Sequence, residues 1–334
     1  MTPARTPVIA ITGYLGAGKT SLLNHLLRQP GARLGVIVND FGQLNVDATL
    51  LSGQVDAAVP ISGGCLCCLP DAGGLDDALA SLADPRLGLD AILVEASGVA
   101  NPLTLAGLIH ASGVRGVRPA GVIEVIDAVE HRRTIGSWLQ PPARYRAATL
   151  VAISKADLVG EEDRDAVLAE IRAVVRERNP EVGFVLAHHG RIDPALVFDI
   201  AAREDAQPML PLVDAAAVGH VHARSASVQV PGPISASALV DLLENPPTGA
   251  YRIKGRVSVR GARSAWGYDV HLVGRRVHVE PWVSAPPVGE LVAIGLDLDA
   301  AAAQVRLDAV AATAGDGPDV NGLNRLQRYR RLSA

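Results

Sequence analysis

In the first two hundred residues, short runs of apolar residues alternate with segments whose apolar residues recur at the spacing of an α-helix. Continuous apolar segments of this length are typical of strands buried on both faces of a parallel sheet. They occupy residues 7–12, 33–39, 90–98, 121–127, 149–153 and 182–186. Helical spacing is found in residues 21–27, 76–83 and 161–178. Because these strands and helices alternate across short turns, the sequence predicts a doubly wound, mostly parallel α/β domain over residues 1–205.

The pattern changes beyond residue 205. Residues 206–224 contain Pro208 and Pro211 and are expected to form a linker. Period-two alternation then predicts strands at 225–230, 251–260, 267–273, 276–280 and 291–295, with helices at 235–244 and 299–312. We therefore expect a smaller C-terminal α+β domain, residues 225–313, with a largely antiparallel sheet. The Arg-rich tail, residues 314–334, is expected to be a loose or docked appendage. Its arginines would suit an acidic partner, but a solvated terminus is the simpler account.

A glycine-rich turn joins the first predicted strand to the first predicted helix. Strand, turn and helix are the context in which a GxxxxGK[ST] motif binds phosphate. Glycines allow backbone N–H groups to approach phosphate oxygens, and the helix adds its positive dipole end. Lys19 is expected to reach the β- and γ-phosphates, and Thr20 to ligate Mg²⁺. The sequence thus predicts a nucleotide-binding P-loop, made of Gly13, Gly16, Ala17, Gly18, Lys19, Thr20 and Ser21.

Two acidic residues follow predicted strands near the P-loop. Asp40 lies in a polar turn where P-loop GTPases have a switch loop. It is either a carboxylate for magnesium or water or the cap of a turn. Glu95 ends a hydrophobic strand at the Walker B position, where a carboxylate holds Mg²⁺. Gly98 follows at a spacing that would bring its N–H to the γ-phosphate. Lys19, Asp40 and Glu95 are therefore the candidate catalytic residues.

All cysteines of the chain lie in one loop, at Cys65, Cys67 and Cys68. A disulfide framework would be spread along the chain. Thiolates are soft ligands for Zn²⁺ and similar transition metals, and a tight loop can bring three of them together. The alternative is simple packing, because unpaired cysteine is commonly buried as a small apolar residue. The clustering favours a transition-metal site.

The segment Ser154-Lys155-Ala156-Asp157 follows a predicted strand. GTPases read guanine with [NT]KxD at such a position, because the aspartate accepts paired hydrogen bonds that adenine cannot donate. Lys155 and Asp157 fit this role, whereas Ser154 is shorter than the usual asparagine. A guanine pocket is predicted from these three residues.

Composition excludes several classes of function. The formal charge is −4, with no basic footprint for nucleic acid. No apolar stretch approaches the eighteen residues needed to span a membrane. The N-terminus lacks a signal-peptide pattern, so the cytoplasm is the expected compartment.

The chain resembles the CobW-type metallochaperone GTPases, relatives of the hydrogenase- and urease-maturation GTPases. The likeness covers residues 7–313 and rests on these segments: GYLGAGKTSLLN (13–24), VIVNDFG (36–42), GGCLCC (63–68), VEASGVANP (94–102), SKADLV (154–159), KGRVSV (254–259) and LVAIGLDLD (291–299). The resemblance implies GTP hydrolysis, with Mg²⁺, coupled to delivery of zinc or cobalt to a client metalloprotein or cofactor pathway. It implies that the three cysteines bind the delivered metal, and it leaves a homodimer open.

The chain departs from the family pattern at several positions. Members usually carry Glu at the positions of Asp40 and Gln43, and Asn or Thr at that of Ser154. A His-rich stretch found in many members is reduced to His220-Val221-His222. Two other functions are compatible with the same motifs: a nucleotide-gated activator of a metalloenzyme that transfers no metal, and an ATP-dependent P-loop kinase. The SKAD segment argues against the kinase.

Overall fold

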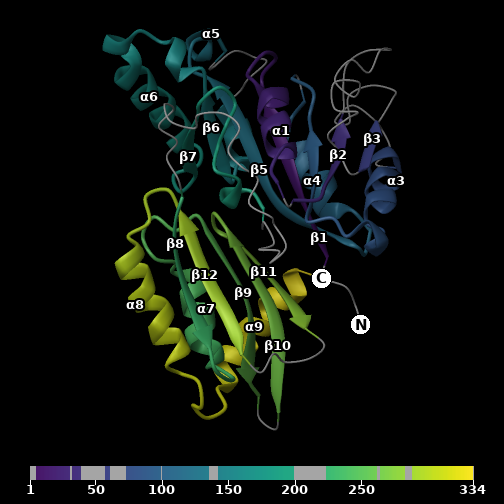
Figure 1. Ribbon diagram of the computed structural model, residues 1–334, viewed down its shortest axis with the longest axis vertical. Helices are drawn as coiled ribbons and strands as arrows, with labels where there is room; N and C mark the ends of the chain where they lie inside the picture. Colours follow the sequence, from purple (N-terminus) through teal and green to yellow (C-terminus); the bar gives the residue numbers. More distant parts are fainter. Residues whose placement is uncertain are drawn as a thin grey trace. The chain divides into compact units, whose positions relative to one another are not determined.

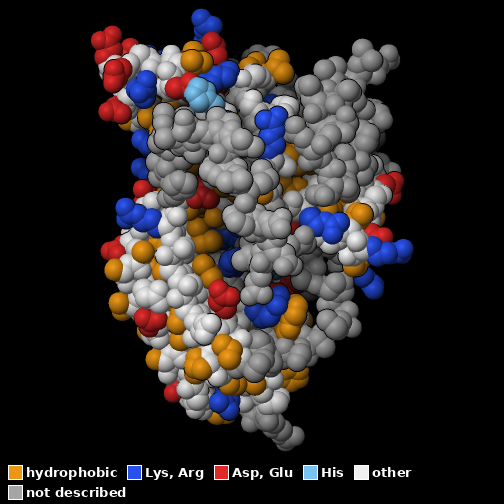
Figure 2. Space-filling model, in the orientation of Figure 1, with side chains coloured by type: hydrophobic (Ala, Val, Ile, Leu, Met, Phe, Trp, Pro, Cys, Tyr) orange, Lys and Arg blue, Asp and Glu red, His pale blue; other side chains and the backbone are white. Residues whose placement is uncertain are grey.

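The computed structural model describes residues 5–30, 32–38, 57–60, 73–98, 100–134, 142–198, 223–261, 264–282 and 288–333. Contacts divide the chain into two compact units, an N-terminal unit of residues 3–220 and a C-terminal unit that begins at residue 221 (Figure 1). Lys and Arg side chains are interspersed with Asp and Glu across the described part of the face in Figure 2. None of the described helices combines the length and the apolarity needed to cross a membrane.

The described strands of the N-terminal unit form one parallel sheet, in the order β3-β2-β4-β1-β5-β6-β7. Its strands are β1 (Thr6–Gly13), β2 (Leu34–Val38), β3 (Ala57–Pro60), β4 (Ala91–Glu95), β5 (Val117–Asp127), β6 (Leu150–Ser154) and β7 (Gly183–Ala187). Every residue of β2, β4 and β6 is buried, which explains why these strands read as unbroken apolar runs. The predicted parallel α/β sheet is confirmed.

Among the described residues of the N-terminal unit, two hydrophobic clusters join α3, α4 and α6 to this sheet. One cluster joins α3 and α4 to β1, β2, β4 and β5, and the other joins α6 to β5 and β6. The helices are α1 (Lys19–Leu27), α3 (Gly73–Leu82), α4 (Pro102–Ala111), α5 (His131–Thr134) and α6 (Glu161–Arg176), with short 3-10 helices η1 (Pro85–Leu87), η2 (Pro142–Ala147), η3 (Ala156–Leu158) and η4 (Pro194–Leu196).

The strand order reverses direction at β1. The chain first moves from β1 to β2 on one side and then, after β4, crosses to β5 on the other side of β1. Ligands of open α/β sheets bind outside the carboxyl ends of the strands at such a point. The turn that follows β1 and the ends of β4, β5 and β6 therefore lie at the edge of the sheet where a ligand is expected.

The C-terminal unit has an antiparallel sheet in the order β11-β10-β9-β12-β8. A single hydrophobic cluster, with Leu239, Val257 and Leu307 among its fully buried members, joins this sheet to the helices. The elements are β8 (Arg224–Val230), α7 (Ala236–Glu244), β9 (Arg252–Arg260), β10 (Ala265–Val273), β11 (Arg276–Trp282), β12 (Gly289–Gly295), α8 (Ala300–Ala311) and α9 (Val320–Leu332). The predicted small α+β fold with an antiparallel sheet is confirmed.

The arginine-rich tail is docked, which is one of the two arrangements expected for it, and its interpretation as a solvated terminus was wrong. Residues 320–332 form α9, which packs against α7 and β11 and buries Leu326 completely. Arg325 pairs with Asp241 at 2.8 Å and with Glu244 at 2.7 Å, both on α7. The acidic partner of this arginine is therefore within the same unit.

Asp319 joins the N-terminal ends of α7 and α9. Its Oδ1 accepts the backbone N–H of Gly322 at 2.9 Å, and its Oδ2 accepts that of Ser237 at 2.8 Å. One carboxylate thus satisfies N–H groups at the start of both helices, which otherwise have no partner within their own helix. Hydrogen bonds donated by Ser237 and by the backbone N–H of Gly322 lower the pKa of Asp319 to about 2.

Candidate functional site

The glycine-rich turn lies directly after β1, between the ends of β4 and β5. Gly18 caps the start of α1 with φ +94°, a left-handed conformation that favours glycine. Gly98 faces the same turn from the end of β4, and a Cβ there would come within 2.6 Å of the backbone N of Leu15. Glycine at these positions allows backbone N–H groups to approach a ligand closely.

A hollow of about 290 Å³ lies over the turn. Most of the predicted phosphate-site residues line it together with residues of the β4 end: Leu15, Gly16, Gly18, Lys19, Thr20, Ser21, Val38, Glu95, Ala96, Ser97 and Gly98. Gly13 and Ala17 belong to the same turn, although they are not among the residues that line the hollow. The structure thus brings α1 and the Walker B strand to one cavity.

Lys19, Thr20 and Glu95 form the polar floor of this hollow. Lys19 is 7% exposed, and its Nζ donates to the carbonyl of Tyr14 at 3.1 Å. Thr20 Oγ1 donates to Glu95 Oε1 at 2.8 Å, and Glu95 is 5% exposed. A buried cation, a hydroxyl and a carboxylate beside open N–H groups suit a phosphate chain and its cation.

Ser154, Lys155 and Asp157 lie at the end of β6. Ser154 Oγ donates to the carbonyl of Ala17 at 2.6 Å, so this short side chain joins β6 to the glycine-rich turn. Lys155 has φ +57°, one of two positive values among non-glycine residues in the described chain. The other belongs to His189, whose Nδ1 lies 3.9 Å from Asp157 Oδ2. The predicted base-reading residues therefore share an edge with the hollow.

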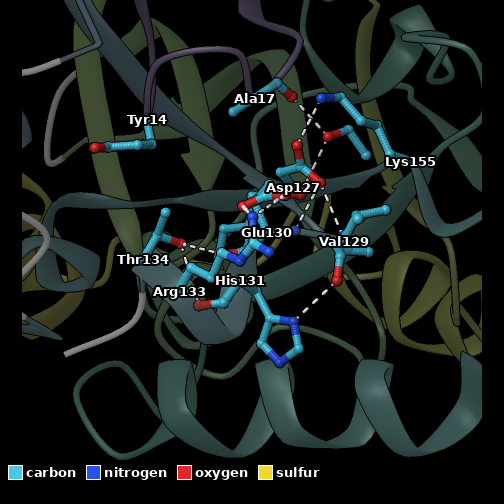
Figure 3. Close-up of polar contacts among 12 residues, drawn as sticks. Tyr14, Ala17, Asp127, Val129, Glu130, His131, Arg133, Thr134 and Lys155 are labelled. Atoms are coloured by element: carbon cyan, nitrogen blue, oxygen red, sulfur yellow. Dashed lines mark hydrogen bonds and ion pairs between the residues drawn. The ribbon is translucent and has the colours of Figure 1, made fainter. Parts of the chain in front are cut away.

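Asp127 was not identified from the sequence. It ends β5 beside Ser154, and its Oδ2 accepts Lys155 Nζ at 2.6 Å. Its Oδ1 accepts the backbone N–H groups of Val129 and Glu130 at 2.9 and 3.2 Å (Figure 3). Asp127 could have been identified from its position, because it ends a predicted strand and the next predicted strand leads into the SKAD segment.

Thr12, at the end of β1 where the glycine-rich turn begins, belongs to a buried polar group with Glu124 and Arg144. Thr12 Oγ1 donates to Glu124 Oε2 at 2.5 Å, and Glu124 pairs with Arg144 at 2.8 Å. Glu124 is 1% and Arg144 4% exposed. Burial, together with the Glu124 charge, raises the pKa of the neighbouring Tyr145. The pattern of apolar positions gave no signal for this group, since Glu124 lies inside a predicted strand.

A second hollow, of about 510 Å³, lies beside α1. It is lined by Ser21, Asn24, His25, Arg28, His189 and Arg191. Ser21 also lines the first hollow, and His189 contacts Asp157. The second hollow therefore adjoins both the phosphate end and the base end of the site.

Several predicted residues lie outside the described residues: Asp40, Gln43, Cys65, Cys67, Cys68, His220 and His222. Within the described ranges, no group of three or more His, Cys, Asp or Glu side chains is arranged to hold a metal ion. The predicted transition-metal site therefore stays a prediction.

Two family models match the chain. The CobW/HypB/UreG nucleotide-binding domain matches residues 7–183, and the cobalamin synthesis protein cobW C-terminal domain matches residues 223–311. The zinc chaperone YjiA of Escherichia coli (strain K12) is 31% identical over 199 residues, which cover 58% of this chain and 60% of YjiA. The zinc chaperone CobW of a Sinorhizobium species is 27% identical over 364 residues, which cover 93% and 100% of the two chains.

A solved structure, that of the Zn(II)-bound YjiA GTPase from E. coli, aligns with a TM-score of 0.44 at 20% identity. The alignment covers 92% of this chain and 99% of that one.

Proposed function

Because the chain belongs to the CobW/HypB/UreG family, we propose that it is a GTP-hydrolysing metallochaperone. In this proposal, the N-terminal unit binds GTP with Mg²⁺ and couples its hydrolysis to the delivery of a transition metal. The observation that carries the proposal is the convergence of Lys19, Thr20 and Glu95 on one hollow, with Lys155 and Asp157 at the same edge of the sheet.

The phosphate chain would lie over the glycine-rich turn. Its oxygens accept hydrogen bonds from the open backbone N–H groups, to which the start of α1 adds its positive dipole end. Lys19 exchanges its contact with the Tyr14 carbonyl for the β- and γ-phosphates and stabilises the charge that develops as the γ-phosphoryl group is transferred to water. Gly98 lies against Leu15 and offers its N–H from the other side of the hollow.

Thr20 and Glu95 suit Mg²⁺. Magnesium takes oxygen ligands at about 2.0–2.1 Å in octahedral geometry, which separates neighbouring ligands by about 3 Å. Thr20 Oγ1 and Glu95 Oε1 are 2.8 Å apart, so the hydroxyl and the carboxylate can share one cation once their mutual hydrogen bond is given up. When bound, Mg²⁺ would neutralise charge on the β- and γ-phosphate oxygens.

Asp157 would select guanine. Its carboxylate accepts hydrogen bonds from two neighbouring N–H groups of guanine, whereas adenine offers none at that edge. An unpaired polar group in a partly dry pocket costs about 1–3 kcal/mol, or roughly tenfold to a hundredfold in affinity. GTP should therefore displace bound GDP much more effectively than ATP does.

The test compares GTP and ATP in the intact protein and in Asp157→Asn. We expect the wild type to prefer GTP by tenfold or more in competition for fluorescent GDP, and Asp157→Asn to lose most of that preference. Asp163→Asn, in the first turn of α6, is the matched control and should keep it. Equal affinity of the wild type for GTP and ATP would contradict the proposal and would favour the ATP-dependent kinase.

The metal cargo is inferred from the relatives and from the cysteine loop. Two relatives are named zinc chaperones, and another, from Dictyostelium discoideum, is named a zinc-regulated GTPase metalloprotein activator. We propose that Cys65, Cys67 and Cys68 bind zinc or cobalt as thiolates and pass it to a client metalloprotein or to a metal-cofactor enzyme. Transfer of radioactive zinc from the loaded protein to a zinc-free acceptor should then depend on GTP. Transfer that is the same with and without GTP would indicate a passive zinc carrier instead.

A further inference from the structure

We infer that Asp127 is the positioning residue of the base site, which holds Lys155 in place for a guanine nucleotide. The inference rests on the proposed function, because it assigns a role within the same nucleotide site. Asp127 touches neither the hollow over the glycine-rich turn nor the Asp157 carboxylate; it acts through Lys155.

Lys155 is constrained by both its backbone conformation and its side-chain contact. The residue lies at the end of β6, where φ is +57°, a conformation that costs free energy for a residue with a side chain. Its Nζ reaches back to Asp127 Oδ2 at 2.6 Å, across the register pair of Asp127 and Ser154. An otherwise unfavourable backbone conformation is thus combined with a short charge-assisted hydrogen bond, which fixes both ends of the side chain.

Asp127 is itself held in a fixed position. It is 9% exposed, and its Oδ1 is held by the N–H groups of Val129 and Glu130. Figure 3 shows the carboxylate between Lys155 on one side and the turn of residues 127–130 on the other. Asp127 is the last residue of β5, which is paired with β6, so the backbone that carries its carboxylate is held in the sheet.

An ordered Lys155 side chain affects how tightly a guanine base binds. Lys155 carries its ammonium group on a four-carbon stem, and holding the ammonium group in place also restricts the stem. Lys155 caps the short helix η3 that contains Asp157, so the stem and the carboxylate that reads the base start from the same turn. A side chain already ordered before binding loses less conformational entropy when the ligand arrives. Asp127 therefore contributes to nucleotide affinity and not to the chemistry at the γ-phosphate.

The experiment uses the full chain and two variants that keep the turn intact. Asp127→Asn retains an amide oxygen for the N–H groups of Val129 and Glu130 but loses the charge toward Lys155. Asp127→Ser keeps a capping hydroxyl that is too short to reach Lys155. We expect both variants to weaken GDP binding and raise the KM for GTP about tenfold, with kcat within twofold of wild type.

A matched control is Asp84→Asn. Asp84 caps η1 through the N–H of Arg86 and also pairs with the Arg86 guanidinium, so it combines a cap and an ion pair as Asp127 does. It precedes β4, at the opposite end of the strand from Glu95. Its GDP affinity should equal that of wild type.

A mutant cycle with Lys155→Ala separates positioning from general stability. If Asp127 acts through Lys155, then adding Asp127→Asn to Lys155→Ala causes no further loss of GDP affinity. Additive losses, or a wild-type KM in Asp127→Asn and Asp127→Ser, would overturn the inference. A fall in kcat with unchanged KM would overturn it as well. If the wild type itself fails to bind GDP, the proposed function fails instead, so the two failures are distinguishable.

Discussion

The two units use charged side chains in opposite ways. In the N-terminal unit, Glu95 and Asp127 end parallel strands and Lys155 follows one, so the three residues gather at one edge of the sheet. In the C-terminal unit, Asp319 and Arg325 join α9 to α7. Carboxyl ends of parallel strands meet at a single edge, so polar groups placed there converge on a ligand. Polar groups on packed helices instead stabilise the packing. The position of a charge in the topology therefore indicates its use better than its residue type does.

The largest expected effect is that of Lys19→Ala in the N-terminal unit. Loss of a preorganised cation at the γ-phosphate should reduce GTP hydrolysis at least about a hundredfold, while the thermal unfolding midpoint stays close to that of wild type. The control is Lys254→Ala, in β9 of the C-terminal unit, which should hydrolyse GTP at the wild-type rate. Steady-state phosphate release measures both. Unimpaired turnover in Lys19→Ala would exclude the P-loop as the catalytic site.

Gly322→Ala should have the converse effect, on stability and not on the nucleotide. Gly322 lies in α9, where a Cβ would overlap the backbone N of Ser237 and approach Asp319 Oδ2 to 2.5 Å. Such overpacking costs about 1–3 kcal/mol, and the N–H acceptor that joins the two helices would be displaced. Urea unfolding followed by tryptophan fluorescence measures the loss, since Trp266 and Trp282 lie in this unit.

The control for this variant is Gly317→Ala, because a Cβ at Gly317 meets nothing within 4 Å. Its unfolding free energy should stay within about 0.5 kcal/mol of wild type. GDP affinity should be unchanged in both variants. An unfolding free energy for Gly322→Ala equal to that of Gly317→Ala would contradict the predicted overpacking between α9 and α7.

A smaller effect is expected from the pH dependence of stability that Asp319 confers. Its pKa is about 2 in the folded chain, below the ordinary value of 3.8. A carboxylate with a lowered pKa stabilises the fold fully above its unfolded pKa, and this contribution disappears as the pH falls through the folded pKa. The contribution is about 1–2 kcal/mol after allowance for solvent screening.

The measurement for Asp319 is the difference in unfolding free energy between wild type and Asp319→Asn at several pH values. The difference should be largest near pH 5 and shrink between pH 4 and pH 2. Other carboxylates titrate in both proteins and cancel in the difference. A difference that stays constant from pH 5 to pH 2 would show that the Asp319 charge is not what stabilises the helix pair.

The signals that predict a phosphate site are local in the sequence. The glycine-rich turn, its strand and its helix occupy adjacent residues, and Lys19 and Thr20 follow from the motif itself. The positions of Glu95 and the SKAD segment also follow from local patterns, since each comes at the end of an apolar run. Ser154 is shorter than the asparagine usual at its position, and its hydroxyl donates to the carbonyl of Ala17, a contact that was not predicted. That contact depends on how closely β6 approaches the turn, which the sequence does not specify.

Of the helices that were not predicted, α4 and α9 were missed for different reasons. The sequence Asn101-Pro102 is a local start signal for α4, with the Asn101 side chain capping Leu103 N–H, but the apolar content of residues 102–111 obscures its periodicity. For α9, a high density of arginine suggests a solvated segment. Its docking depends on Asp241, Glu244 and Ser237, residues about eighty positions earlier in the chain. Asp127 and the Glu124–Arg144 pair were missed for the same reason, because each depends on contacts between distant segments.

We propose that the binding of nucleotide and the binding of metal are coupled in this protein. In the sequence, Cys65, Cys67 and Cys68 lie between Asp40 and the strand that ends at Glu95, and we propose that a nucleotide held at Thr20 and Glu95 changes their metal affinity. Coupling is reciprocal: any factor by which GTP raises metal affinity must equal the factor by which metal raises GTP affinity. Thiolates must also lose protons to bind, so metal affinity should fall as the pH drops below neutral.

The most direct test is the affinity for zinc and cobalt with GDP, with a non-hydrolysable GTP analogue and without nucleotide, in wild type and in Cys67→Ala. The account predicts tighter metal binding with the analogue in wild type, with that tight binding abolished in Cys67→Ala. Identical metal affinity in all three nucleotide states would contradict it.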